Sequence, residues 1–292
     1  MSTVGGSFAV SDLLVGYPVA PAQAARYLLG AAVLVAWARW RGIPLRRPTR
    51  RQSGRLALLA ATGLTGFNVC VVLGLSHAEP AAVSVVVGTT PLVLAVLPPL
   101  LSGRRPQPRL VGAAAVVLVG VAFVEGSGTT SLVGLLFCLG ALGGEVAFTL
   151  LAVPLLPRLG PVAVSVHTCL IAAGQLVLVA PLLAAATSTP VVRVPTAAEA
   201  SATVFLALAV TAVAFVAWYT AVGRLGSERA GLLAGLMPVA ALVAGLGLGT
   251  DGATVATVTG AVLVGAGVAS GLTGGRIAAV SSARGTPGAV RG

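Results

Sequence analysis

Long apolar runs separated by short polar links dominate the chain. A membrane-spanning helix needs about 20 predominantly apolar residues, and ten runs reach or approach that length. They lie near residues 4–19, 22–40, 55–75, 80–101, 108–125, 131–153, 161–186, 201–222, 229–249 and 253–273. The first run is short, so we expect either a degenerate first helix or a chain start that lies further upstream. The pattern predicts an all-α polytopic membrane protein with ten transmembrane helices, the first short or truncated.

The composition supports this prediction. Hydrophobic residues make up 57% of the 292 residues and charged residues only 9%, whereas a soluble domain usually carries about 25% charge. All 18 basic residues are arginine, and most lie in short clusters between apolar runs. Aromatic residues are few and do not alternate with the arginines, so the positive charge does not indicate a nucleic-acid partner.

The arginine clusters predict the orientation, because arginine-rich links stay in the cytoplasm. Alternate links are arginine-rich, and the others are mostly acidic. The first set holds Arg41, Arg46, Arg47, Arg50, Arg51, Arg55, Arg104, Arg105, Arg109, Arg158, Arg224 and Arg229, and the second holds Asp12, Glu79, Glu125, Glu199 and Asp251 with Arg193. We therefore expect a multi-pass protein of the inner (plasma) membrane with both termini in the cytoplasm.

Two parts of the chain repeat each other. Residues 66–101 and 214–249 each contain a span, a short polar link with a glutamate, and a second span with a central proline, Pro91 or Pro238. The first polar link lies on the acidic side and the second on the arginine-rich side, so the copies are inverted, as in many secondary transporters. We expect a five-helix repeat over residues 1–126, a second over 127–275, and a disordered cytoplasmic tail over 276–292.

Residues 215–268 carry an ordered set of features that resembles a known family. They are an aromatic helix with Trp218 and Tyr219, the segment Ala221 to Gly226, the central Pro238, Asp251 in an acidic turn, and a glycine-rich closing helix from Gly260 to Gly267. The set resembles the second repeat of EamA-type transporters of the drug/metabolite transporter superfamily, and the resemblance covers nearly the whole chain. It implies ten helices in two inverted five-helix bundles that export or exchange small metabolites, and it names no substrate.

Glu145 is the first candidate for chemistry, because it interrupts an apolar run. A charged side chain at the centre of a transmembrane helix costs about 2.5–3.5 kcal/mol on insertion scales, and such residues commonly mark a functional site. A carboxyl group that gains and loses a proton as the site alternates between the two sides would couple transport to protons. The alternative is a neutral, structural Glu145 that hydrogen-bonds to a neighbouring helix.

Arg26 is the second charge within an apolar run. Its guanidinium group would bind an anionic group of a solute through two parallel hydrogen bonds. The alternatives are a side chain that reaches the lipid headgroups or one that pairs with Asp12 or Glu79.

Five further side chains stand out within the spans, each with two interpretations. Asn68 and Gln175 either bridge helices or line the path of a solute. His167 either relays protons or has a structural role at the membrane surface. Trp218 and Tyr219 either form an aromatic wall of a cavity or pack in the core.

The two central prolines and the three cysteines are also interpreted from their positions in the apolar runs. Pro91 and Pro238 lack the N–H group that a helix needs, so we expect them to break their helices. The three cysteines lie in apolar runs without a Cys-x-x-Cys pair and are interpreted as buried hydrophobic residues. We therefore expect no metal, no cofactor and no catalytic residues.

These features predict a secondary transporter that exports a small organic metabolite or drug-like solute, with proton coupling through Glu145. One alternative is a gradient-independent exchanger or facilitator of the same fold. A remote alternative is a membrane-embedded enzyme, which would need convergent catalytic groups. The expected partners are the solute, the lipid bilayer and protons, and a homodimer is left open.

Overall fold

The computed structural model describes residues 17–283, except residue 127, residues 237–238, residue 241 and residues 244–253. Eight segments of the described residues are helices long and apolar enough to cross a bilayer. They are α2 (Val19–Trp40), α3 with η2 and α4 (Arg50–Ala60, Ala61–Gly66, Phe67–Leu75), α5 with α6 (Pro80–Val87, Thr90–Leu101), α7 (Pro108–Glu125), α8 (Leu132–Leu150), α9 (Leu156–Thr187), α10 with η3 and α11 (Ala197–Phe205, Leu206–Val213, Ala214–Leu225), and α14 (Val255–Ala283).

The all-helical prediction is confirmed for the part of the chain that the structure describes, where the only extended pairing is an isolated bridge between Ala78 and Thr130. The first predicted span lies outside the described residues. The ninth is described mainly at its start, as α12 (Ser227–Leu232) and η4 (Leu233–Gly235). Ten helices therefore remain a prediction. Helix α14 continues past Arg276 to Ala283, into the segment expected to be disordered.

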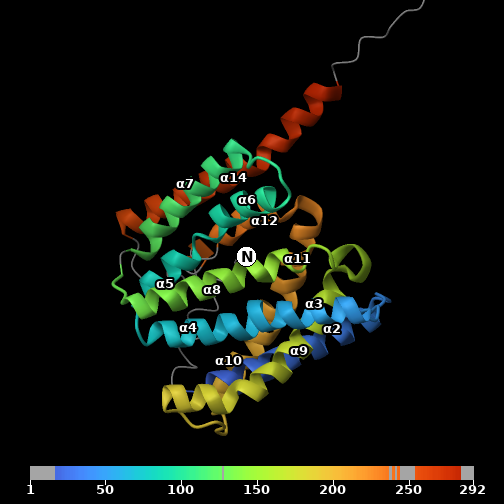
Figure 1. Cartoon of the computed structure of the whole chain (residues 1–292), viewed down its shortest axis with the longest axis vertical. Coiled ribbons are helices and arrows are strands. Elements are labelled where there is room, and N and C mark those ends of the chain that lie inside the picture. The colour runs from blue at the N-terminus through green and yellow to red at the C-terminus, as the bar shows by residue number, and fades with distance from the viewer. Residues whose placement is uncertain (1–16, 127, 237–238, 241, 244–253, 284–292) are drawn as a thin grey trace, which may run out of the picture.

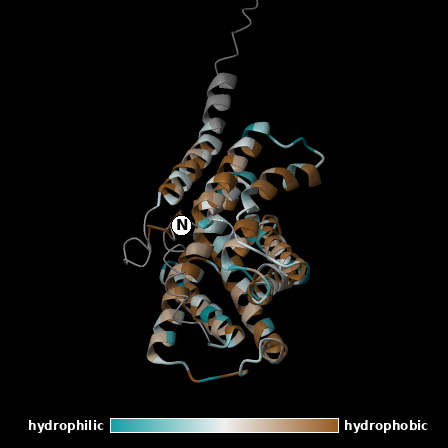
Figure 2. Ribbon diagram, turned by 90° about the vertical axis from the view of Figure 1, so that its left-hand side faces the viewer, coloured by the Kyte–Doolittle hydropathy of each residue, from teal (hydrophilic) through white to brown (hydrophobic). Residues whose placement is uncertain are grey.

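The helices form a bundle with an apolar surface. In Figure 1 most of them run side by side, and α7 and α14 lie together along one edge. Large apolar side chains such as Leu132, Leu178 and Leu182 are more than 70% exposed, and hydrophilic residues are frequent in the links at the helix ends (Figure 2). An exterior this apolar suits lipid rather than water, as the sequence predicts.

Helix α7 crosses α14 closely because both carry glycine at the crossing. A Cβ atom at Gly120 would lie 2.7 Å from the Gly260 carbonyl oxygen, and one at Gly260 would lie 2.5 Å from the Gly120 carbonyl oxygen. Two turns away, a Cβ atom at Gly267 would lie 2.9 Å from the carbonyl oxygen of Ala113. Small residues allow membrane helices to approach in this way.

The span from Pro80 to Leu101 is interrupted between α5 and α6 at Gly88 and Thr89. Pro91 lies in the first turn of α6, where a missing N–H group costs little. The same proline cannot donate to the carbonyl group four residues earlier, that of Val87. The hydroxyl group of Thr90 donates to this carbonyl oxygen at 2.6 Å instead. Pro91 therefore interrupts the helix, and the neighbouring Thr90 supplies the hydrogen-bond donor that the Val87 carbonyl group would otherwise lack.

Two other spans contain a π-helical segment in the middle, η2 between α3 and α4, and η3 between α10 and α11. A π-helix has i to i+5 hydrogen bonds, is rare, and is frequent at functional sites. Each segment has one face buried in the bundle, and that face contains a threonine, Thr65 in η2 and Thr211 in η3. These two threonines turn out to be partners of the polar side chains described next.

Candidate functional site

Glu145 lies on α8, closer to the end of the helix at Leu150 than to its start at Leu132. Its side chain is half-buried, and no salt bridge of the described residues includes it. Among the described residues its carboxyl group makes no hydrogen bond either, whereas its backbone carbonyl oxygen accepts one from the Thr149 hydroxyl group.

Close packing between α8 and η2 fixes the position of Glu145. A Cβ atom at Gly144 would lie 2.7 Å from the Thr62 carbonyl oxygen, and one at Gly63 would lie 2.7 Å from the Cβ atom of Phe148. A larger residue at Gly63 or Gly144 would push the helices apart. The glycine that precedes Glu145 therefore lets this part of α8 pack directly on the π-helical segment.

Arg26 lies on α2 and reaches across to η3. Its Nε donates to Oγ1 of Thr211 at 2.8 Å, and its Nη1 donates to Oε1 of Gln23 at 3.1 Å. The guanidinium carbon lies 5.6 Å from the centre of the Tyr27 ring. Of the two acidic partners considered from the sequence, Asp12 lies outside the described residues. Glu79 instead accepts hydrogen bonds from Thr129.

Glu79 belongs to the link on the acidic side, outside the membrane-spanning segments. The backbone N–H of Thr129 and its hydroxyl group each donate to the carboxylate at 3.0 Å. These hydrogen bonds favour the ionised form and hold the pKa of Glu79 below its usual range. Its role is to join the links before α5 and before α8.

Gln175 makes a second contact with a π-helical segment. The hydroxyl group of Thr65 in η2 donates to its Oε1 at 3.0 Å, and its Nε2 donates to the Ala57 carbonyl oxygen at 3.1 Å. One side chain of α9 therefore binds both η2 and the preceding α3. Asn68, the other amide, donates to the Tyr27 hydroxyl at 3.0 Å and to the Leu64 carbonyl oxygen at 2.7 Å. Both amides bridge helices.

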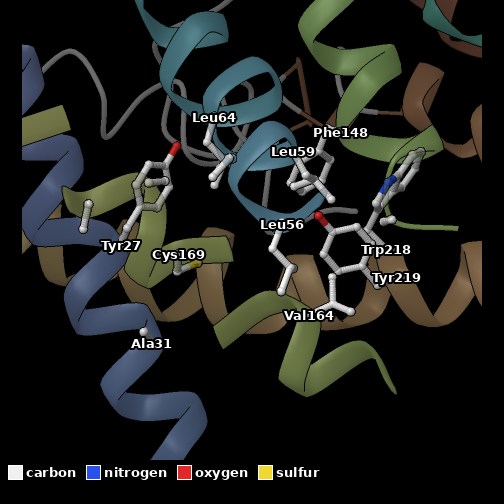
Figure 3. Close-up of a cluster of buried hydrophobic side chains, with 14 of the residues drawn as sticks. Tyr27, Ala31, Leu56, Leu59, Leu64, Phe148, Val164, Cys169, Trp218 and Tyr219 are labelled. Carbon is white, nitrogen blue, oxygen red and sulfur yellow. The ribbon is translucent and has the colours of Figure 1, made fainter. Parts of the chain in front are cut away.

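A chain of aromatic rings connects these contacts. The ring centres of Tyr27 and Phe215 are 6.4 Å apart, those of Phe215 and Phe148 are 5.0 Å apart, and those of Phe148 and Tyr219 are 5.0 Å apart. Figure 3 shows side chains from α2, α3, α8, α9 and α11 converging in this region. The Nε1 of Trp218 donates to Thr149 at 3.2 Å. Tyr219 and Trp218 are buried, so both pack in the core of this structure.

Two predicted residues lie elsewhere. The Nε2 atom of His167 is 3.2 Å from the Arg46 carbonyl oxygen, in the link on the arginine-rich side. His167 therefore does not take part in the interior contacts. It connects the α2–α3 link to α9. Pro238 lies outside the described residues. Within the described residues no group of three or more metal-binding side chains occurs.

Reasoning from the sequence missed Thr65, Thr211 and Tyr27. Threonine is common in membrane helices, so its presence does not indicate a site. A tyrosine next to an arginine does not indicate one either. The partners Arg26, Asn68 and Gln175 did stand out, because charges and amides are rare in apolar runs. Only the folded chain shows which hydroxyl groups they reach.

Interrupted membrane helices around interior polar side chains are the architecture of a membrane transporter. Comparisons with known proteins give the same class. Residues 1–126 match the EamA-like transporter family. The chain is 31% identical over 253 residues to the "Probable terminal-alkyne amino-acid exporter" of Streptantibioticus cattleyicolor. The alignment covers 84% of this chain and 82% of that protein. This chain belongs to the EamA-type transporters of the drug/metabolite transporter superfamily.

Two further comparisons agree. The "Uncharacterized transporter YetK" of Bacillus subtilis is 27% identical over 254 residues, covering 83% of this chain and 75% of that protein. A solved crystal structure with 22% sequence identity superposes with a TM-score of 0.79, covering 94% of this chain and 96% of the other. At this identity the structural match speaks for the fold alone. The protein is thus a multi-pass membrane transporter.

Proposed function

We propose that the protein is a secondary transporter that exports a small amino-acid-like solute in exchange for protons. The observation that carries this proposal is a pair of opposite charges in the membrane interior, Arg26 and Glu145, neither of which forms a salt bridge within the described residues. Charges in such a place are expensive and commonly serve transport. A solute with both a carboxylate and an ammonium group offers a partner to each. The amino-acid exporter among the relatives supports this class of solute.

Arg26 is the proposed anion-binding residue. Thr211 and Gln23 hold Nε and Nη1 and thereby fix the plane of the guanidinium group. The remaining N–H groups can then meet a carboxylate with little loss of side-chain entropy. The hydrogen bond to Thr211 supports this proposal over the alternative in which Arg26 only reaches the headgroups, because it directs the side chain toward η3.

Glu145 is the proposed proton-coupling residue. An ionised Glu145 attracts the ammonium group of the solute, and a protonated one releases it. Proton and solute therefore compete for one group, which makes proton entry drive solute exit when the site faces the two sides in turn. The close packing of α8 on η2 supports this proposal, because π-helical segments are frequent at functional sites.

We further infer that the two halves of the chain are inverted five-helix repeats, over residues 1–126 and 127–275, with the arginine-rich side in the cytoplasm. Two contacts support this. The close approach of Gly120 to Gly260 recurs as that of Gly267 to Ala113, and Ala113 and Gly260 are 147 positions apart, as are Gly120 and Gly267. The same shift carries η2 into η3.

The test is uptake of neutral amino acids into proteoliposomes with an acidic lumen, for wild type, Glu145→Gln and, as a matched acid-to-amide control, Glu125→Gln. Proton efflux should drive uptake by wild type and by the control. We expect Glu145→Gln to lose the response to the pH gradient. Uptake by wild type that ignores the gradient would support the gradient-independent facilitator instead. Absence of flux for the whole panel would refute transport of this class of solute.

A further inference from the structure

The structure contains a cavity of about 490 Å³ on the arginine-rich side, where the ends of α6, α8 and α11 meet the start of α12. Its apolar lining includes Leu110, Leu150 and Pro154, and its polar lining includes Arg104, Glu228 and Arg229. We refer to it as the entry cavity. Leu150 follows Glu145 on α8 by five positions, about 7.5 Å along a helix axis. We refer to Arg26 and Glu145 together as the interior site. The cavity is close to Glu145, but neither of these two residues lines it.

A salt bridge joins the two halves of the chain at the wall of the entry cavity. Nη2 of Arg104, before α7, lies 3.3 Å from Oε1 of Glu228, in the first turn of α12. The side chain of Arg104 is 63% exposed, whereas that of Glu228 is 16% exposed. Because Glu228 is largely buried and Arg104 is exposed, Glu228 is the less mobile partner. Arg104 makes one contact with it and keeps other N–H groups available.

Arg229 adds a second guanidinium group to the same wall. It is half-buried, and no hydrogen bond of its side chain occurs among the described residues. Two arginines and one glutamate line the cavity, so the lining is net positive. The arginine-rich links around the opening strengthen a field that attracts anions.

A lining that combines net positive charge with apolar side chains fits one class of ligand. We propose that the entry cavity first binds the solute, and that it selects an anionic group attached to an apolar body. The proposal rests on the transporter function and deepens it by assigning a second binding site on the route to Arg26. A planar guanidinium group suits a carboxylate because it can donate two parallel hydrogen bonds. A cavity of this volume lies within the range of small-molecule sites.

The test uses three probes with the same six-carbon body: hexanoate, hexylammonium and 1-hexanol. Binding to the purified chain in phosphatidylcholine nanodiscs is measured by titration calorimetry. We expect hexanoate to bind more tightly than the other two. Arg229→Gln should weaken hexanoate binding about tenfold, the loss typical of a hydrogen bond to a charged group. Arg47→Gln is the matched control, because Arg47 is exposed on the same side and does not line the cavity.

Two further variants separate this site from the interior one. Glu228→Gln should strengthen hexanoate binding, since it removes a repelling charge and frees Arg104 from its partner. Arg26→Gln should leave the Arg229-dependent binding unchanged. If Arg26→Gln abolishes hexanoate binding and Arg229→Gln does not, the entry cavity is refuted while the interior site gains support. If binding depends on Arg229 but no solute is transported, the cavity stands and the proposed function fails.

An anionic lipid headgroup shares the chemistry of the probe. The titration is therefore repeated in nanodiscs that contain phosphatidylglycerol. Unchanged hexanoate binding supports a free solute as the ligand. Loss of the Arg229-dependent binding in these nanodiscs would mean that a headgroup fills the cavity, which contradicts the proposal.

Discussion

Two polar contacts connect facing helices to the π-helical segments, and they differ in charge. Arg26 of α2 donates to Thr211 of η3, and Gln175 of α9 accepts from Thr65 of η2. The amide of Gln175 is engaged at both of its polar atoms, because its Nε2 also reaches a carbonyl oxygen of α3. The guanidinium group of Arg26 keeps donors to spare. Similar contacts therefore differ in what they leave over: Gln175 has both polar atoms bonded, whereas the Arg26 guanidinium retains N–H groups that the proposed anion site would use.

The largest expected effect comes from removing the charge at Arg26. Arg26→Gln should lower the transport efficiency for amino acids about 10- to 100-fold, since hydrogen bonds to a charged group contribute about 1.5–3 kcal/mol. The measurement is initial uptake into proteoliposomes over a range of solute concentrations. Gln175→Leu is the comparison, and it should change transport less than Arg26→Gln does. Equal losses in the two variants would contradict a special role for the charged contact.

Removing the two threonines sharpens the comparison. Thr211→Val removes one of the two hydrogen bonds that hold the guanidinium group and leaves only the bond to Gln23, so it should raise the KM for transport several-fold with little change in stability. Thr65→Val removes a bond between neutral groups in the membrane, so it should lower the free energy of unfolding by about 0.6 kcal/mol, and by no more than about 1.7 kcal/mol. Uptake kinetics and thermal unfolding of both variants test this. If Thr211→Val lowered the stability and Thr65→Val raised the KM, the roles of the two contacts would be the opposite of those stated here.

The smallest effect is expected at Glu79, which provides an acid outside the membrane for comparison with Glu145. Its folded pKa lies below the unfolded value of about 4.3 because Thr129 donates to it. A lowered pKa stabilises the fold above the unfolded pKa, and this contribution disappears as the pH falls through the folded pKa. Glu79→Gln should therefore reduce thermal stability at pH 7 and make less difference at pH 3.

Transport provides the second readout for that variant. Glu79 stays ionised between pH 5 and 8, so Glu79→Gln should leave the pH dependence of uptake in this range unchanged. Glu145→Gln should remove that dependence. A change in the pH profile caused by Glu79→Gln would show that the acidic link takes part in coupling.

The sequence by itself determined the helical architecture. In a bilayer, an apolar run of about 20 residues must form a helix, because only a helix pairs all of its backbone groups within the segment. Eight predicted spans are helices in the structure. The position of Glu145 within its span also follows from the pattern alone. The missing N–H of Pro91 indicates an interruption near Gly88, where α5 and α6 meet.

Only the tertiary structure decided how the polar groups meet. Apolar periodicity carries no sign of a π-helical turn, because that turn depends on what packs against it, such as Phe148 on Gly63 in η2. The threonine partners of Arg26 and Gln175 are 185 and 110 positions away. Arg104 and Glu228 are separated by 124 positions. Hydrogen bonds and salt bridges act over a few ångströms, so contacts between such distant residues exist only once the helices have packed.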